Sequence, residues 1–179
     1  MAEWQKILIS ALAGLFTGLV AEPLRTLLQQ TLVKRRISAL LIDEILENSF
    51  HVVFAMKLSK GRPPLDPPSV LVLSRERYEH IRDRERSTLY LIKGYKGIDN
   101  FFKAMQEFSG KPLPLSPMDE YNLLIQFDSM KYDAEHGNLT RQFKNRLVGG
   151  KETRLLEAAS MFNEFPPELP ELEEGHVAP

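Results

Sequence analysis

The chain has 179 residues, 43% of them hydrophobic, and 23 Lys and Arg residues nearly balance 24 Asp and Glu residues for a formal net charge of -1. A chain of this length forms one domain or one domain plus an anchor, and the balanced charge argues against a nucleic-acid-binding protein. The chain has no cysteine, which excludes disulfide bonds, thiolate metal ligands and a cysteine nucleophile.

The amino-terminal segment contains an uncharged run from Ile7 to Ala21, ILISALAGLFTGLVA. At about 1.5 Å per residue, a helix of this length covers roughly 22 Å, less than the roughly 30 Å of hydrocarbon in a bilayer. Trp4 suits the headgroup level and the long side chain of Lys6 can extend toward it, so a span that begins near Trp4 is physically feasible. We therefore predict a transmembrane helix.

Other interpretations of this run stay open. It also fits the buried core helix of a soluble protein, a helix that lies in the membrane interface, or a signal peptide. Two residues argue against the signal peptide: Glu3 is acidic where such peptides are basic, and Leu19 is large where cleavage after Ala21 needs a small residue.

Basic residues flank the apolar run unequally. Lys6 precedes the run, whereas four basic residues follow it: Arg25, Lys34, Arg35 and Arg36. The positive-inside rule then predicts a single-pass protein with its amino terminus outside and its body in the cytoplasm. The same four residues are predicted to contact anionic lipid headgroups, with a solvated charged turn as the alternative.

Small residues recur every four positions within the run, at Ser10, Gly14 and Gly18. This spacing places them on one helix face and allows a close approach between two membrane helices. It predicts a homodimer formed through the amino-terminal helix. The alternative is that glycine and alanine are simply frequent in membrane helices.

Pro23 follows the run and has no amide hydrogen, so we expect a break or kink between Ala21 and Pro23. An amphipathic juxtamembrane helix should then begin. Its leucines share one face: Leu24, Leu27, Leu28 and Leu32. Residues 1–36 are thus predicted to form a membrane anchor and a basic juxtamembrane helix.

Two helices with apolar seams are predicted in the body. The first covers residues 37–58, and its seam contains Leu41, Ile45, Asn48, Val52 and Ala55. The second seam contains Leu91, Tyr95, Ile98, Phe102 and Met105. Steps of three and four residues are typical of helices that cross at a shallow angle, which predicts an antiparallel helix pair. Asn48 should be hydrogen-bonded, because an unpaired amide in the seam would be costly.

Helix-capping residues predict further short helices. Ser74 should cap an exposed helix over residues 75–86 that carries intrahelical ion pairs. Ser116 and Pro117 predict the start of a helix that ends by Gly137. Its predicted buried face contains Met118, Tyr121, Leu124, Ile125 and Phe127.

The predicted elements after Gly137 complete an all-α body. One short helix passes through Leu139, Phe143 and Leu147, and a last one contains Leu155, Leu156, Ala159, Met161 and Phe162. Residues 37–163 are therefore predicted to form a helical cytoplasmic domain. The acidic segment 164–179 is predicted to be a disordered tail.

No catalytic, cofactor-binding or metal-binding pattern emerges. Glu44, Glu47 and His51 lie close along one predicted helix, but a di-iron site needs Glu-x-x-His on two helices, which these residues do not provide. Residues 149–151 resemble the end of a phosphate-binding loop, yet Glu152 occupies the position of the required hydroxyl. We therefore expect no cofactor and no enzymatic activity.

The order of three motifs, AGLFTGLVAEPLR, VKRR and LLIDEILEN, resembles small bacterial proteins that have an amino-terminal single-pass membrane segment and a helical cytoplasmic body. The likeness covers residues 4–105. It implies a location and transfers no activity or catalytic residues.

These observations predict a membrane-anchored scaffold or sensor that contacts the lipid bilayer and an unknown cytosolic protein, and that binds no nucleic acid. One alternative is a membrane-perturbing effector that self-assembles through its amino-terminal helix. Another is a soluble helical protein that buries this helix. The last alternative requires that the body enclose Leu8, Leu12, Leu15 and Leu19.

Overall fold

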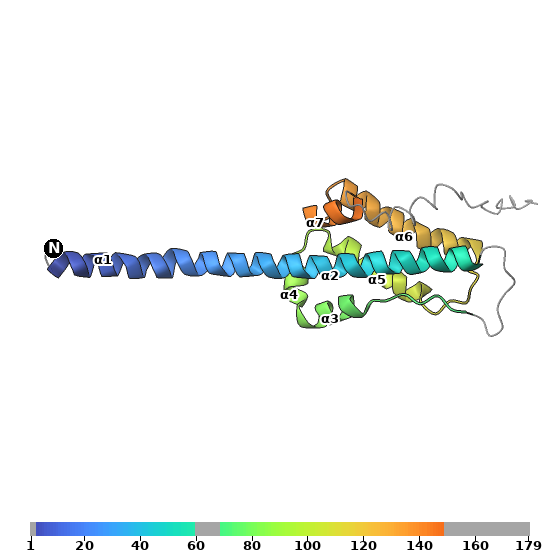
Figure 1. The fold of residues 1–179 in the computed structure, drawn as a ribbon, viewed down its shortest axis with the longest axis horizontal. Helices are drawn as coiled ribbons and strands as arrows, with labels where there is room; N and C mark the ends of the chain where they lie inside the picture. The colour runs from blue at the N-terminus through green and yellow to red at the C-terminus, as the bar shows by residue number, and fades with distance from the viewer. Residues whose placement is uncertain (1–2, 60–68, 149–179) are drawn as a thin grey trace, which may run out of the picture.

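The computed structural model describes residues 3–59 and 69–148. Its elements are α1 (Glu3–Phe16), η1 (Thr17–Ala21), α2 (Glu22–Ser59), α3 (Glu76–Arg84), α4 (Arg86–Leu89), α5 (Tyr95–Phe108), α6 (Pro117–Glu135), α7 (Arg141–Phe143) and η2 (Lys144–Val148). The predicted all-α class is confirmed for the described residues. Figure 1 shows α1, η1 and α2 as one long rod, with the other helices gathered around the carboxy-terminal half of α2.

The helix does not break at Pro23, so that prediction is wrong. Residues Thr17–Ala21 form a π-helical turn, in which the backbone N–H of Glu22 donates to the carbonyl of Thr17. A π-helical turn holds more residues than an α-helical one, so the carbonyl groups before the Pro23 ring lie where the ring does not collide with them. The rod therefore runs uninterrupted from Glu3 to Lys57.

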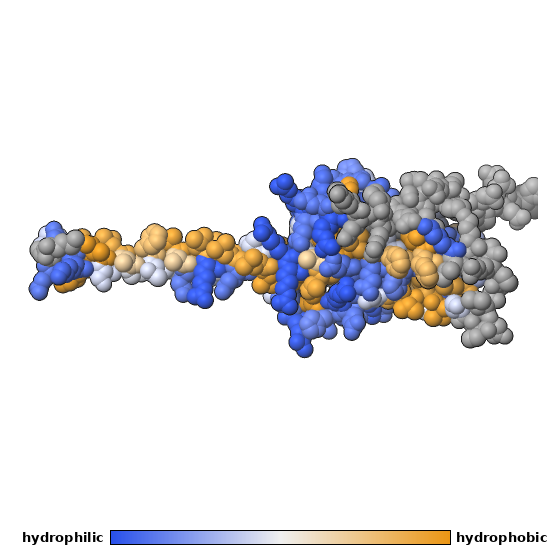
Figure 2. All heavy atoms as spheres, viewed as in Figure 1, coloured by the Kyte–Doolittle hydropathy of each residue, from blue (hydrophilic) through white to orange (hydrophobic). Residues whose placement is uncertain are grey.

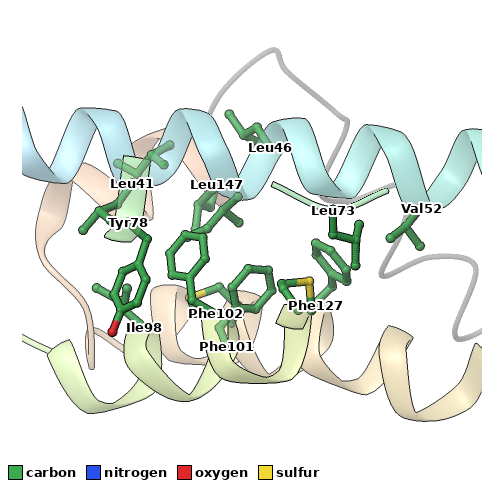
Figure 3. Packing of buried hydrophobic residues seen from close by; sticks show 14 of the residues in the cluster. Leu41, Leu46, Val52, Leu73, Tyr78, Ile98, Phe101, Phe102, Phe127 and Leu147 are labelled. Carbon is green, nitrogen blue, oxygen red and sulfur yellow. The ribbon is translucent and has the colours of Figure 1, made fainter. Parts of the chain in front are cut away.

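The core lies between α2 and the later helices. The predicted seam of α2 is confirmed, because Leu41, Ile45, Asn48, Val52 and Ala55 are all buried. Aromatic rings fill the space opposite this seam (Figure 3). Phe102 stacks on Tyr78 with 4.5 Å between ring centroids, and Phe101 meets Phe127 edge-on at 5.1 Å. These ring contacts add stabilisation beyond the apolar area that they bury.

The second predicted seam is only partly correct. Ile98, Phe102 and Met105 are buried on α5, but Leu91 lies in the turn before that helix and is 60% exposed. α5 packs chiefly against α6, whereas α2 packs against α3, α4 and α7. The predicted antiparallel pair of α2 and α5 is therefore not confirmed.

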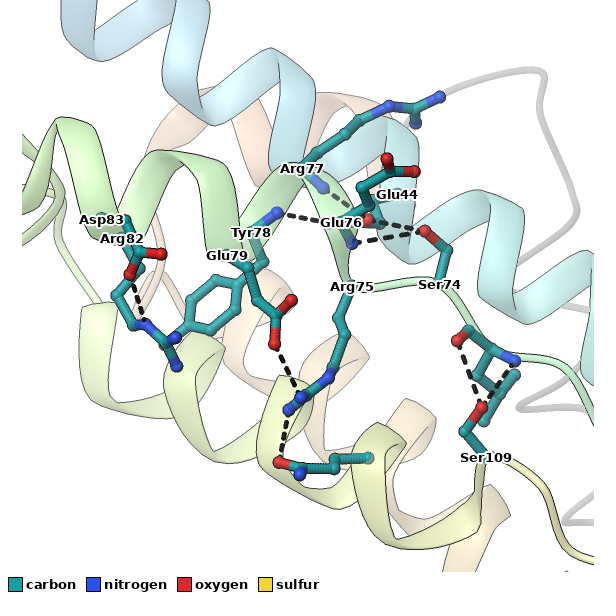
Figure 4. Close-up of polar contacts among 12 residues, drawn as sticks. Glu44, Ser74, Arg75, Glu76, Arg77, Tyr78, Glu79, Arg82, Asp83 and Ser109 are labelled. Atoms are coloured by element: carbon teal, nitrogen blue, oxygen red, sulfur yellow. Dashed lines mark hydrogen bonds and ion pairs between the residues drawn. The ribbon is translucent and has the colours of Figure 1, made fainter.

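A buried carboxylate fixes α3 on α2. Glu44 of α2 is fully buried and accepts hydrogen bonds from the backbone N–H groups of Arg77 at 2.9 Å and Tyr78 at 2.8 Å, and from the Ser74 hydroxyl at 2.8 Å (Figure 4). The first N–H groups of a helix have no partner inside it, and a carboxylate also complements the positive end of the helix dipole. Glu44 thus caps α3 from a different helix.

Asn48 joins the same junction one turn further along α2. Its amide nitrogen donates to the Ser74 carbonyl, and its amide oxygen accepts from the Ser74 N–H, both at 2.7 Å. The prediction that this seam residue is hydrogen-bonded is confirmed. In the segment before Ser74, the Leu71 N–H donates to the Lys111 carbonyl, and the Leu71 carbonyl accepts from the Gly110 N–H.

α6 begins and ends as predicted, and its predicted buried face is partly correct, because Leu124 and Phe127 are buried. The Ser116 hydroxyl accepts from the Asp119 N–H at 3.1 Å, and the helix ends at Glu135, shortly before Gly137 at φ 73°. Met118 and Ile125 are exposed. The buried face contains Leu123, Leu124, Phe127, Met130 and Ala134.

The end of the described chain agrees with the prediction of a short helix. Leu139, Phe143 and Leu147 are buried, and α7 and η2 carry the last two of them. The predicted final helix and the acidic tail lie outside the described residues.

Candidate membrane-anchoring helix

The amino-terminal part of the rod is apolar and exposed. Leu8, Leu12, Leu15 and Leu19 are between 55% and 68% exposed, and none of the apolar window that is long enough to cross a membrane is buried. Figure 2 shows this segment projecting from the body with hydrophobic residues along it. None of the described helices α3 to α7 covers these leucines, so the part of the body that the structure describes does not enclose this segment.

Burial begins abruptly at Ile37. Between Glu3 and Arg36 no side chain is buried, whereas Ile37 is 2% exposed and Ser38 is 3% exposed. The exposed length is about 51 Å at about 1.5 Å per residue. This change falls where the anchor was predicted to meet the body, although the backbone of α2 passes through it without interruption.

The predicted small-residue face is open along its length. Gly14 and Gly18 have no atom within 4 Å of the position where a Cβ would lie, and Ser10 is exposed. A second helix therefore meets no steric obstacle at this face. The structure contains one copy of the chain, so the predicted homodimer stays a prediction.

Three threonines satisfy their hydroxyl groups within the rod. The hydroxyls donate to the carbonyl four residues earlier, Thr17 to Ala13 at 2.7 Å, Thr26 to Glu22 at 3.0 Å and Thr31 to Leu27 at 2.8 Å. A hydroxyl without a partner is costly in hydrocarbon, and this bond removes that cost. Sequence reasoning missed these residues, although a threonine in an apolar helix is itself the signal.

The predicted lipid-contacting cations lie on the exposed part of α2. Arg25, Arg35 and Arg36 are exposed, and Lys34 is half-buried where the rod enters the body. None of the four forms an ion pair with another residue in the described ranges. Glu22 is the only acidic residue between Met1 and Asp43 apart from Glu3. This part of the rod is therefore strongly basic.

The carboxylates and histidine weighed as metal ligands are used otherwise. Glu44 caps α3, Glu47 pairs with Arg77 at 3.1 Å, and the Nδ1 atom of His51 lies 3.2 Å from the Val72 carbonyl. Within residues 3–59 and 69–148, no group of three or more His, Cys, Asp or Glu side chains is placed to hold a metal ion. The feature of the described chain with the clearest functional chemistry is thus the exposed helix.

No family model, curated protein or solved structure matches the chain. The resemblance to small bacterial membrane-anchored proteins therefore stays a prediction.

Proposed function

We propose that this chain is a single-pass membrane protein whose rod anchors a helical scaffold at the cytoplasmic face of a bilayer. The observation that carries the proposal is the exposure of every large apolar side chain between Trp4 and Leu32. A contiguous apolar surface of this size is unfavourable in water at about 25 cal/mol per Å², and it marks a membrane or protein contact. The bonded hydroxyl of Thr17, which lies within the apolar run, suits hydrocarbon in the same way.

The charge distribution supports the proposed orientation. Lys6 lies before the apolar run, whereas Arg25, Lys34, Arg35 and Arg36 follow it on the exposed helix. The more basic flank stays on the cytoplasmic side of a membrane, which places the body there and the amino terminus outside. In that position the body is accessible to a cytosolic protein partner.

A second function, that of a membrane-perturbing effector, is favoured by the open glycine face. Gly14 and Gly18 present bare backbone to the surroundings of the helix, which permits tight self-association in the bilayer. Toxicity on overexpression that disappears in Gly14→Leu and Gly18→Leu variants would favour the effector. Normal growth on overexpression of both the unsubstituted chain and the glycine variants would favour the scaffold.

Alkaline carbonate extraction tests the anchor. The full chain should stay with the membrane pellet, because a spanning helix resists conditions that release proteins bound to the surface. The control replaces Leu12 and Leu15 with Asp, two charges near the middle of the span that cost about 2.5 kcal/mol or more each. This variant should move to the supernatant. Release of the unsubstituted chain would overturn the proposal.

A further inference from the structure

The exposed apolar surface of the rod continues well past the predicted span. Leu24, Leu27, Leu28 and Leu32 are all more than half exposed, and they belong to the same unbroken helix. From Ile7 to Leu32 this helix measures about 39 Å, compared with roughly 30 Å of hydrocarbon. An upright helix that enters the hydrocarbon at Ile7 would therefore carry Leu27, Leu28 and Leu32 beyond it.

The leucines form one face with cations at its borders. At about 100° per residue they fall within a sector of about 140°. Arg25 and Arg36 lie just beyond one border of this sector, Lys34 lies just beyond the other, and Arg35 lies within it at the carboxy-terminal end. The opposite side carries Glu22, Thr26, Gln29 and Gln30. We call residues Leu24, Leu27, Leu28 and Leu32 the leucine face.

A second copy of the chain fits this face poorly. In a parallel pair joined through the leucine face, Arg25, Lys34 and Arg35 would meet their own counterparts or one another. The flanks contain no acidic residue to pair with them, since Glu22 lies on the opposite side. Like charges at these positions repel. The interface of an anionic bilayer offers apolar chains for the leucines and negative headgroups for the cations.

We propose that the leucine face lies in the interfacial layer of an anionic bilayer, and that the rod crosses this bilayer at a steep tilt. The structure has no hinge between the span and α2, so both parts share one axis. A tilt of about 40°, at the upper end of observed values, shortens the vertical extent of this helix from about 39 Å to roughly 30 Å. If the rod leans toward its leucine face, this face meets the interfacial layer and the opposite side faces the water. The inference rests on the proposed membrane anchor and adds how the anchor holds the body.

Single-cysteine spin labelling tests this geometry, because the natural chain has no cysteine. Three full-length variants are needed: Leu12→Cys in the span, Leu28→Cys on the leucine face, and Gln30→Cys at nearly the same height on the opposite side. Each is labelled with a nitroxide in vesicles of phosphatidylcholine and phosphatidylglycerol. Relaxation by oxygen reports exposure to lipid, and relaxation by a water-soluble nickel complex reports exposure to water.

The expected result is lipid exposure at Leu12→Cys and Leu28→Cys and water exposure at Gln30→Cys. Water exposure at both Leu28→Cys and Gln30→Cys, with Leu12→Cys in lipid, would overturn the tilt and leave the anchor standing. A Leu28→Cys label shielded from both reagents would show that a protein surface covers the face, which also overturns the inference. Water exposure at Leu12→Cys would overturn the anchor itself.

The cations supply a further readout. Replacing Arg25, Lys34, Arg35 and Arg36 by Gln one at a time should shift the Leu28→Cys label toward water about fivefold per charge removed, because each contributes about 1 kcal/mol of attraction to an anionic surface. A matched change of Arg84→Gln, at an exposed position of α3, should leave the label unmoved. An equal shift of the label on replacing Arg84 and on replacing the rod cations would show that these cations do not hold the leucine face at the anionic surface.

Discussion

The carboxylate of Glu44 in α2 accepts a hydrogen bond from the backbone N–H of Tyr78 in α3, with 2.8 Å between the two atoms. The same carboxylate also holds the Arg77 N–H and the Ser74 hydroxyl. A helix that continues from the anchor thus supplies the cap for the next helix of the body. The junction couples the orientation of the rod to the position of α3.

Removing this charge should destabilise the body. Glu44→Gln keeps the size of the side chain but presents an amide group where three donors converge, so at least one buried donor loses its partner. We expect a loss of about 2–3 kcal/mol in the free energy of unfolding. The control is Glu47→Gln, which removes only the exposed pair with Arg77 and should cost less than about 1 kcal/mol. Thermal unfolding followed by circular dichroism measures both, and equal effects would contradict the capping role.

The Asn48 amide should contribute to the stability of the body although it lies in an apolar seam. Asn48→Leu would extend the seam, but both the N–H and the carbonyl of Ser74 bond to the Asn48 amide and would lose their partner. Leaving them unpaired should cost about 2–4 kcal/mol. A rise in the unfolding midpoint of Asn48→Leu would show that these bonds contribute nothing net.

The hydroxyl of Tyr78 should make the body sensitive to high pH. Burial raises the pKa of Tyr78, and the hydrogen bond that its hydroxyl donates to Asp99 raises this pKa further. The contribution to stability is complete below the unfolded pKa of about 10 and is lost as pH rises above it, since the unfolded chain releases the proton first. Unfolding titrations across this range should show falling stability. Tyr78→Phe should flatten the dependence of the unfolding free energy on pH. An unchanged slope in this variant would contradict the role given to the Tyr78 hydroxyl.

Asp119 should act at the other end of the pH scale. A hydrogen bond from the Lys111 ammonium, followed by one from the Ser116 hydroxyl, lowers the pKa of the Asp119 carboxyl. Its contribution is present above the unfolded pKa of about 3.9 and is lost as pH falls through the lower folded value. Comparison of acid unfolding in the natural chain and in Asp119→Asn should show a shallower acid transition in the variant. Identical acid transitions in the two proteins would show that Asp119 does not contribute to acid unfolding.

Local patterns predicted the parts of this fold that local physics determines. The seam of α2 and the Ser116 cap of α6 depend on residues within a few turns of one another, and both are confirmed. The Glu44 cap joins residues far apart in the chain, and no spacing rule indicates it. The break expected at Pro23 is absent because the π-helical turn before it accommodates the proline ring. The presence of a proline does not by itself predict such a turn.

The candidate site also has features that the local sequence predicts and features that depend on the tertiary structure. The uncharged run and its basic flank are visible in the sequence, and they predicted an anchor. Whether the body would enclose the run depended on where α3 to α7 pack. The structure packs them against the part of α2 whose buried residues begin at Ile37. The extension of the apolar face to Leu32 along one straight axis required knowledge that the helix continues through Pro23.

The open glycine face gives a last prediction about self-association. Adding a branched side chain at Gly14 prevents two backbones from approaching closely, so a Gly14→Ile and Gly18→Ile double variant should lose association of the full chain in vesicles. The matched control is Ala13→Ile, which adds similar bulk on another side of the helix. Energy transfer between donor-labelled and acceptor-labelled chains should fall severalfold in the glycine variant and stay unchanged in the control. Equal energy transfer in all three proteins would show that the glycines serve no contact between copies.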